Sequence, residues 1–435
     1  MLVSGDDPLQ EIFDAEMARL MPEPWPAAIG VAVSGGSDST TLMHLAACWG
    51  QAHRVAVHVA TVDHKLRPES SAEAEGVARS AAALGLSHAT LPWEGWDRNG
   101  NLQNAARQAR RTLLAEWAVE TGVPVILLGH TSDDQLETLF MNLSRGSGLS
   151  GLTGIAHRAR LLEGRDPWLK DLWLLRPLIK QQRKTLQTWL TDRSIGWLDD
   201  PSNQDQRFKR SHLRKALEQD AATHFWRRMT ETRERLARAQ RAVEAYAQEV
   251  GRRIAQVHFG DVLFEREGLL EAEDEIRMHL FSHALTWITG LEHRPRALAT
   301  ERAFAEMEEG KGGTLHGCIW RIEGDRIRVF REVKAVGTKP HGFDGRRLWD
   351  RRWLIEGPSG TDLRALGPDG WAQMKAQRYG TPLQEDAPPR ESLLAYPSLW
   401  RGRELLTLPP FHGAGARATL HPRCGEFFES IRRIR

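Results

Sequence analysis

The segment from Val31 to Thr40 constrains the fold of this 435-residue chain more than any other. An apolar run ends at Val33, six glycine or polar residues follow (Ser34-Gly35-Gly36-Ser37-Asp38-Ser39), and a helical pattern starts at once. This order is typical of a strand, a tight turn and a helix N-terminus. Backbone N–H groups of such a turn, the helix dipole and the serine hydroxyls all attract a phosphate or pyrophosphate.

The turn carries an acid where the best-known phosphate loop carries a base. A Walker-type loop ends in Gly-Lys-Ser/Thr, but no lysine follows Gly36. Asp38 is present instead, and a carboxylate here suits a divalent cation that accompanies a polyphosphate. We therefore expect residues 34–39 to bind the phosphates of a nucleotide and Asp38 to support the metal ion. A turn that needs glycine for its backbone alone is the simpler alternative.

Composition limits the classes of protein to consider. The chain has 59 basic and 57 acidic residues, so any nucleic-acid surface must be a local patch. Its 3 cysteines, at positions 48, 318 and 424, form no Cys-x-x-Cys pair, which argues against disulfides, a zinc knuckle and an iron–sulfur cluster. No signal peptide and no membrane-spanning run is recognised. We expect a cytoplasmic protein that makes no use of a membrane.

Strands and helices alternate in the first half of the chain. Asp7-Pro8 is typical of a capped helix start. Apolar strands are expected at residues 29–33, 55–62, 89–91 and 124–128, and helices at 71–84, 102–119 and 132–143. This alternation predicts an α/β fold with a doubly wound parallel sheet, covered by helices on both faces. Ligands of such sheets bind beyond the carboxyl ends of the strands.

Two further polar clusters follow strand ends. Asp63 and His64 come directly after the second strand, and His130 after the fourth. The helix that follows His130 is capped by Thr131 or Ser132, and Asp134 and Glu137 share one of its faces. A histidine and carboxylates beside a phosphate loop can bind a cation, orient a nucleophile or accept its proton. A well-capped helix with no further role is the alternative.

Arginines form a third feature. Arg107, Arg110 and Arg111 lie one turn apart on the expected helix 102–119, and Arg145 opens the glycine-rich run to residue 152. Arginines near a polyphosphate stabilise charge on the leaving group, although each alone is more often a solvated surface residue. The glycine-rich run resembles a mobile contact surface, or a lid. The polar run 199–210 is either an ordinary loop or a nucleic-acid contact.

The pattern changes near residue 216. A long charged helix is expected over 225–254, with further helices at 275–288 and 300–307. Two alternating segments around Glu323-Gly324-Asp325 predict a hairpin, and a Gly/Pro-rich linker spans 336–342. We therefore divide the chain into a nucleotide-binding domain (1–215), a helical domain that ends in the hairpin (216–335), and a small C-terminal α+β domain (343–435).

These motifs together resemble the PP-loop ATP-pyrophosphatase superfamily. Ser34 to Ser39 fits its signature at every position, and the whole set is similar to bacterial tRNA(Ile)-lysidine synthetases. The set comprises Val62-Asp63-His64-x-Leu66-Arg67, Ala106-Arg107-x-x-Arg110, Gly129-His130-x-x-Asp133-Asp134-Gln135-x-Glu137-Thr138, Arg145-Gly146-Ser147-Gly148, Arg176-Pro177-Leu178 and Asp200-Pro201-Ser202-Asn203 to Arg210 and Arg214. Arg111 stands where the family usually has Tyr, and Ser211 where it often has Asn.

The resemblance implies a ligase that uses ATP and Mg²⁺. Cytosine O2 at the wobble position of a tRNA(Ile) with a CAU anticodon attacks the α-phosphate, and pyrophosphate leaves. The ε-amine of free L-lysine then attacks C2, AMP leaves and lysidine results.

The resemblance also implies roles for individual residues. The ATP site comprises Ser34, Gly35, Gly36, Ser37, Asp38, Ser39, Asp63 and His64, with Asp38 as metal ligand. The catalytic residues are Asp38, Arg107, Arg110, His130, Asp134 and Glu137; Arg107 and Arg110 stabilise charge, and the last three bind and deprotonate lysine. Arg145, Asn203, Arg207, Arg210 and Arg214 contact the tRNA. We expect the C-terminal half, with Arg326, Arg328 and Arg331 along one strand, to contact the tRNA stem; surface charge on a packing domain is the alternative. A homodimer is compatible with this interpretation.

Three other functions are weighed against this one. Thiolation of tRNA on the same fold needs cysteines near the site, and the N-terminal half has only Cys48, within a helix. Members of the superfamily that amidate a small acid lack the Asp-Pro-Ser-Asn segment and the long appendage. A non-catalytic nucleotide-binding module would bind ATP and release no pyrophosphate.

Overall fold

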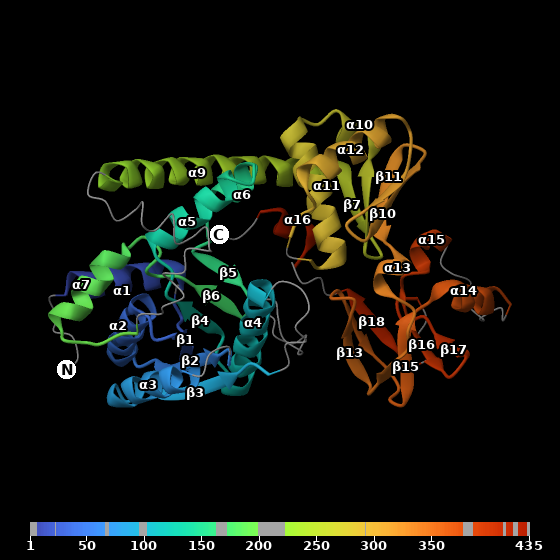
Figure 1. Ribbon diagram of the computed structural model, residues 1–435. Coiled ribbons are helices and arrows are strands. Elements are labelled where there is room, and N and C mark those ends of the chain that lie inside the picture. Colours follow the sequence, from blue (N-terminus) through green and yellow to red (C-terminus); the bar gives the residue numbers. More distant parts are fainter. Residues whose placement is uncertain are drawn as a thin grey trace. The chain divides into compact units, whose positions relative to one another are not determined.

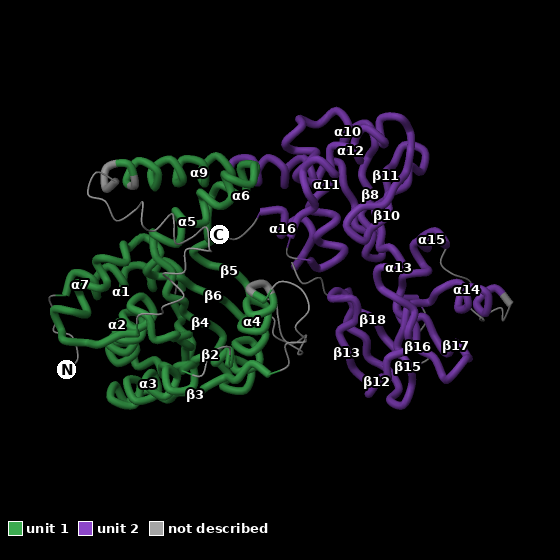
Figure 2. The backbone as a smooth tube through the Cα atoms, in the orientation of Figure 1, with its two compact units in different colours: residues 1–240, 434–435 green, residues 241–433 purple. Residues whose placement is uncertain are grey.

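The computed structural model describes residues 7–21, 23–65, 69–94, 102–161, 172–198, 222–291, 293–376, 386–411, 415–420 and 425–432. Contacts within the chain separate two compact units, residues 1–240 with 434–435 and residues 241–433 (Figure 2). The helix α9 (Ala222–Ile254) begins in the first unit and ends in the second. The three-domain division stays a prediction.

A six-stranded sheet forms the centre of the first unit (Figure 1). Its order is β3 (Ser87–Pro92), β2 (Ala56–Asp63), β1 (Ala28–Ala32), β4 (Val125–Leu128), β6 (Trp173–Leu175) and β5 (Arg158–Arg160). The first five strands pair in parallel, which confirms the predicted parallel sheet. The edge strand β5 pairs antiparallel to β6. Because β1 lies between β2 and β4, the loops after these three strands are neighbours at the carboxyl edge.

Helices cover both faces of this sheet. They are α1 (Pro8–Leu20), α2 (Ser37–His53), α3 (Ser70–Ala83), α4 (Leu102–Thr121), α5 (Ser132–Leu143), α6 (Leu149–Leu152) and α7 (Arg183–Asp192). One core joins α1, α2, α3 and α7 to the sheet, and a second core joins α4 to its other face. Alternation within β4 divides the strand between them, since Val125 and Leu127 belong to the first core and Ile126 to the second. The sheet is therefore doubly wound.

Local signals explain where the first helix begins. Pro8 is its first residue, and the Asp7 carboxylate accepts hydrogen bonds from the backbone N–H groups of Leu9 and Gln10 at 2.9 and 3.4 Å. The other carboxylate oxygen of Asp7 accepts from Trp189 Nε1 at 2.7 Å and from Arg193 at 2.6 Å. The predicted cap is confirmed, and it also fastens α1 to α7.

The second unit contains two hydrophobic cores. The first includes the end of α9 and a five-stranded sheet of order β7 (Ala255–His258), β8 (Asp261–Glu265), β11 (Arg326–Arg331), β10 (Cys318–Glu323) and β9 (Gly313–Leu315). Its helices are α10 (Arg266–Leu270), α11 (Asp274–Thr289), α12 (Ala297–Glu308) and α16 (Phe427–Ile431). Strands β10 and β11 pair antiparallel across Glu323 and Arg326, as the predicted hairpin requires.

The second core lies between two smaller sheets. One has the order β12 (His341–Phe343), β15 (Thr361–Ala365), β16 (Pro397–Arg401) and β17 (Glu404–Thr407), and the other β13 (Arg346–Trp349), β14 (Trp353–Glu356) and β18 (Arg417–Leu420). Three helices accompany them: α13 (Val333–Val336), α14 (Gly367–Ala376) and α15 (Arg390–Leu393). No helix among the described residues is long and apolar enough to cross a membrane.

The structure corrects one expectation about β11. Arg328 and Arg331 are buried and form ion pairs with Asp261 and Asp350, at 3.2 and 2.9 Å, so they do not offer a surface for a tRNA stem. The sequence shows only that the arginines lie along one strand, whereas partners from other segments of the chain enclose Arg328 and Arg331. Arg326 is exposed.

Candidate functional site

The predicted phosphate loop joins β1 to α2 at the carboxyl edge of the sheet. Gly35 adopts φ +86°, and a Cβ there would lie 2.5 Å from Leu198 Cδ1, so the turn requires glycine. The Ser39 hydroxyl accepts a hydrogen bond from the Ser34 backbone N–H at 3.2 Å and donates to the Gly36 carbonyl at 3.1 Å. Gly36 is the N-cap of α2, and the helix N-terminus with its dipole lies directly at the loop.

Gly129 packs against this helix N-terminus from the end of β4. A Cβ on Gly129 would lie 3.0 Å from three backbone atoms, Asp38 C, Ser39 Cα and Ser39 N. Backbone atoms within a helix cannot move aside as a flexible side chain can. The absence of a side chain at residue 129 therefore allows the second polar cluster to lie against the phosphate loop.

The second cluster is held by the start of α5. Thr131 is the N-cap, and its backbone N–H and hydroxyl both donate to the Asp134 carboxylate, at 2.8 and 3.0 Å. Glu137, one turn further on, is buried. The structure thus places Asp134 and Glu137 on the same side of α5, as the helical spacing predicts.

Arg183, which the sequence did not single out, brings the two clusters together. It is the first residue of α7, and its Nε donates to Asp38 Oδ2 at 2.8 Å. The same guanidinium lies 3.4 Å from Asp134 Oδ1 and 4.0 Å from Glu137 Oε1. Three predicted site carboxylates from two helices therefore converge on one arginine.

Burial and this arginine determine the charge states of the acids. Burial raises the pKa of Asp38, and the adjacent Arg183 opposes that rise without cancelling it. Burial also favours the neutral form of Asp134, but Arg183 and the hydrogen bonds from Thr131 outweigh it, so the pKa of Asp134 lies below its ordinary value. Asp134 is thus a carboxylate near neutral pH.

The other side of the site is basic. Arg176 follows β6, is buried, and donates from Nε to His130 Nδ1 at 3.3 Å. Burial and then the positive charge of Arg176 lower the pKa of His130 to about 3, although Asp134 acts in the opposite direction. His130 is therefore neutral at physiological pH and, with Nδ1 accepting, carries its proton on Nε2.

The three arginines of α4 belong to this basic side. Burial and the charges of Arg111, Arg107 and Arg110 lower the pKa of Arg176 to about 10. Arg107 and Arg110 also contribute to the low pKa of His130. The predicted arginines therefore lie close enough to affect the predicted histidine, as an anion site at this edge requires.

Asp63 and His64 end β2 on the same edge. Asp63 is buried and accepts hydrogen bonds from the Lys65 N–H and the Ser71 hydroxyl, at 2.9 and 3.0 Å. These bonds fix its carboxylate at the strand end. Burial and then Arg110 lower the pKa of His64, and its Nδ1 is enclosed without a hydrogen-bond partner.

The remaining predicted residues lie apart or outside the described chain. Arg145 is exposed, beyond the end of α5. The glycine-rich run that it opens is folded back, since Asn142 Nδ2 donates to the Gly151 carbonyl at 2.8 Å. Asn203, Arg207, Arg210 and Arg214 lie outside the described residues, as do Leu66 and Arg67.

The acids of this site are better suited to a metal ion that is already bound to a polyphosphate than to a metal ion held by protein side chains alone. In the part of the chain that is described, no group of three or more His, Cys, Asp or Glu residues is arranged to hold a metal ion. Mg²⁺ on a nucleotide needs only one or two carboxylates besides the phosphates. Asp38, in the first turn of α2 beside the predicted phosphate loop, can meet that requirement.

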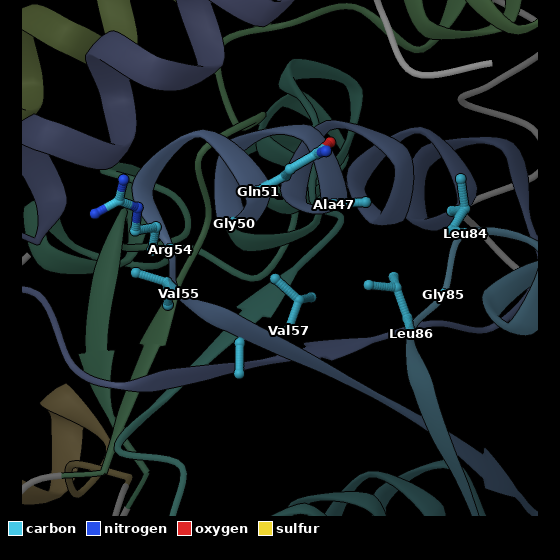
Figure 3. A pocket seen from close by; sticks show the side chains of 10 residues that line it. Ala47, Gly50, Gln51, Arg54, Val55, Val57, Leu84, Gly85 and Leu86 are labelled. Carbon is cyan, nitrogen blue, oxygen red and sulfur yellow. The ribbon is translucent and has the colours of Figure 1, made fainter.

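A hollow elsewhere on the first unit has a different character. Figure 3 shows that Gln51 and Arg54, near the end of α2, lie on one side of it, and Val57 and Leu86 on the other. Gln51 belongs to the last turn of α2 and Val57 to the beginning of β2, whereas Arg54 directly follows α2 and Leu86 directly precedes β3. The hollow is therefore at the amino edge of the sheet, away from the predicted site.

Comparison with known proteins identifies the class of the first unit as a PP-loop domain. Residues 9–221 match the family model of the PP-loop domain. Among solved structures, the U34-tRNA thiolase NcsA from Methanococcus maripaludis aligns with a TM-score of 0.41 and 14% identity, over 52% of this chain and 78% of that one, and this score is too low to carry an argument about fold or function.

Curated relatives narrow the class further. The tRNA(Ile)-lysidine synthase of Ruegeria pomeroyi is 40% identical over 405 residues, which are 92% of this chain and 92% of the relative. The tRNA(Ile)-lysidine synthase of Bradyrhizobium diazoefficiens is also 40% identical, over 75% of this chain and 96% of the relative. The chain belongs to the tRNA(Ile)-lysidine synthase family.

Proposed function

We propose that the chain uses ATP to join lysine to C2 of the wobble cytidine of tRNA(Ile) with a CAU anticodon. The single observation that carries this proposal is the division of charge at the carboxyl edge of one sheet. The edge that carries the predicted phosphate loop has an acidic side (Asp38, Asp134, Glu137) and a basic side (Arg107, Arg110, Arg176). A polyphosphate and a cationic amino acid need this combination at one site.

The first step is adenylation of the base. Cytosine O2 attacks the α-phosphate of ATP, and pyrophosphate leaves. The N-terminus of α2 and the hydroxyls of residues 34–39 bind the phosphates, and Arg107 and Arg110 stabilise the negative charge of the transition state. Mg²⁺, when bound at Asp38, adds further charge neutralisation on the leaving group.

The second step joins lysine to the activated base. Its ε-amine attacks C2, and AMP leaves. Asp134 and Glu137 bind the ε-ammonium, and Asp134 accepts a proton from it, because an ammonium is no nucleophile. His130 is not suited to be the base at Nε2, where it carries a proton; it is a neutral donor beside the substrate instead.

The described cysteines argue against thiolation as the reaction. Cys48 lies inside α2, near the helix end remote from the phosphate loop. Cys318 is fully buried in the second unit, and burial raises its pKa to about 12. Neither is at the carboxyl edge of the sheet or available there as a thiolate.

The test is direct. The protein is incubated with ATP, labelled lysine and tRNA(Ile) bearing CAU, and the nucleosides are analysed by mass. We expect a lysine adduct on cytidine and release of pyrophosphate that depends on the tRNA. Release without tRNA, or no adduct, would contradict the proposal. A cytoplasmic location, tRNA contacts at Arg145 and at residues 203–214, and a homodimer remain predictions beside it.

A further inference from the structure

Arg183 occupies the centre of the acidic side. Its guanidinium donates to Asp38 and lies within ion-pair distance of Asp134 and Glu137. The three acidic side chains are 14%, 21% and 3% exposed, and that of Arg183 is 22% exposed. The contacts are therefore partly shielded from water. Charge interactions in such a shielded place are stronger than on an open surface.

Several acids share this one arginine. Besides the three carboxylates near its guanidinium, Asp133 accepts a hydrogen bond from the Arg183 backbone N–H at 2.9 Å. Asp134 and Glu137 both lie within ion-pair distance of Arg183. A second cation that binds to these two acids must therefore share them with Arg183.

The side chain of Arg183 is separable from the structural role of its helix. The start of α7 is fastened by the backbone N–H bond to Asp133, which any residue except proline can make. Leu186, Trp189 and Leu190 of α7 are buried in the core of the first unit. The helix therefore has anchors that do not involve the guanidinium, and the guanidinium is turned to the site.

We infer that Arg183 is an internal competitor of the substrate ammonium: it holds Asp38, Asp134 and Glu137 in place before lysine enters, and it sets the affinity for lysine by competing for Asp134 and Glu137. This inference rests on the proposed function. A neutral side chain cannot displace a guanidinium from its ion pairs with carboxylates, whereas an ammonium group can. Arg183 in this way favours an amino acid with a cationic side chain over one of similar length without charge.

The experiment compares Arg183→Gln with the wild type at saturating ATP and tRNA(Ile), with lysine varied. Without the competing charge, we expect the KM for lysine to fall at least threefold. We expect kcat to fall at least tenfold, because Asp38 and Asp134 lose the group that positions them. A merely structural role would raise KM or leave it unchanged. Lys184→Gln removes an exposed positive charge from the adjacent residue of α7 and should change neither constant.

Two further measurements keep the inference falsifiable. Arg183→Lys retains the charge, and so protects the fold, but an ammonium cannot span three carboxylates; its KM for lysine should fall at least twofold. Millimolar methylguanidinium added to Arg183→Gln should raise KM towards the wild-type value and restore part of kcat. If folded variants show an unchanged or higher KM, the inference about Arg183 is wrong while the proposed function stands. If the wild type forms no lysine adduct, both are wrong.

Discussion

Replacement of Gly129 by alanine tests how closely the two polar clusters must pack. The added Cβ would lie 3.0 Å from Asp38 C, Ser39 Cα and Ser39 N, closer than the usual 3.4–4 Å of such contacts. All three atoms belong to the N-terminus of α2, where the phosphates of ATP are predicted to bind. The strain can be relieved only if β4 and α2 move apart by a few tenths of an ångström.

The cost follows from the general penalty for overpacking. An extra carbon in a well-packed interior typically costs about 1–3 kcal/mol. We expect Gly129→Ala to lower the free energy of unfolding of the first unit by about that amount. The same displacement moves Asp38 and Ser39 away from the phosphates, so the KM for ATP should rise in tRNA-dependent pyrophosphate release.

Gly76→Ala is the matched control. Gly76 lies inside α3, and the nearest atom to an added Cβ is Arg79 Nη2 at 3.9 Å, on a flexible side chain. Alanine there should stabilise the helix by about 0.5–1 kcal/mol and leave the KM for ATP unchanged. Urea unfolding followed by hydrogen exchange of peptides from α2 and β4 separates the first unit from the second. If Gly129→Ala behaves like Gly76→Ala in both assays, the packing argument is refuted.

Three other predictions concern acids. Asp7→Ala removes the cap of α1 and leaves Trp189 Nε1 buried without its acceptor, so urea unfolding should show a loss of about 2–4 kcal/mol. Asp134→Asn should reduce lysine incorporation by about 10²-fold or more while pyrophosphate release without lysine persists; unchanged incorporation would exclude Asp134 as the base. Burial raises the pKa of Asp261 from its ordinary 3.8 to about 6, although Ser392 and Arg328 oppose this. Because the pKa of the folded state is the higher one, protonation favours the folded state, and lowering the pH from 7 to 4 should stabilise the wild type by about 2 kcal/mol relative to Asp261→Asn. Urea unfolding across this pH range checks the difference, and parallel curves would contradict it.

The parts of the fold that repeat a local pattern were predictable. The helix expected at 132–143 is α5 with the same bounds. The strand expected at 29–33 differs from β1 by one residue at each end, and the strand expected at 124–128 differs from β4 by one residue at its start. Each combines an apolar period with a cap or a turn residue close by in the sequence. Because strands alternate with helices in the sequence, a parallel sheet could be predicted. The parallel sheet in turn predicted that the site lies at the carboxyl edge of the strands.

The missed parts depend on contacts between distant residues. The strand β6 has three residues, too few to show a period, so Arg176 could not be placed after a strand. Arg183 reaches Asp38 across 145 positions, and nothing near Arg183 distinguishes it from other arginines. The expectation that Arg328 and Arg331 lie on the surface was wrong for the same reason. Their ion-pair partners, Asp261 of β8 and Asp350, are distant in the sequence.

Under the proposed function, Arg183 supplies a positive charge to a phosphate loop that carries an acid in place of a lysine. In a Walker-type loop the positive charge is part of the loop and stays with the phosphates. Here the loop carries Asp38, and the positive charge comes from α7, on a side chain that is shared with Asp134 and Glu137. A charge held in this way can respond to a second substrate. Under the proposed competition between Arg183 and the substrate ammonium, the loop acid couples the nucleotide to the amine. This suits the proposed reaction, in which pyrophosphate leaves first and an ammonium then approaches the same edge of the sheet.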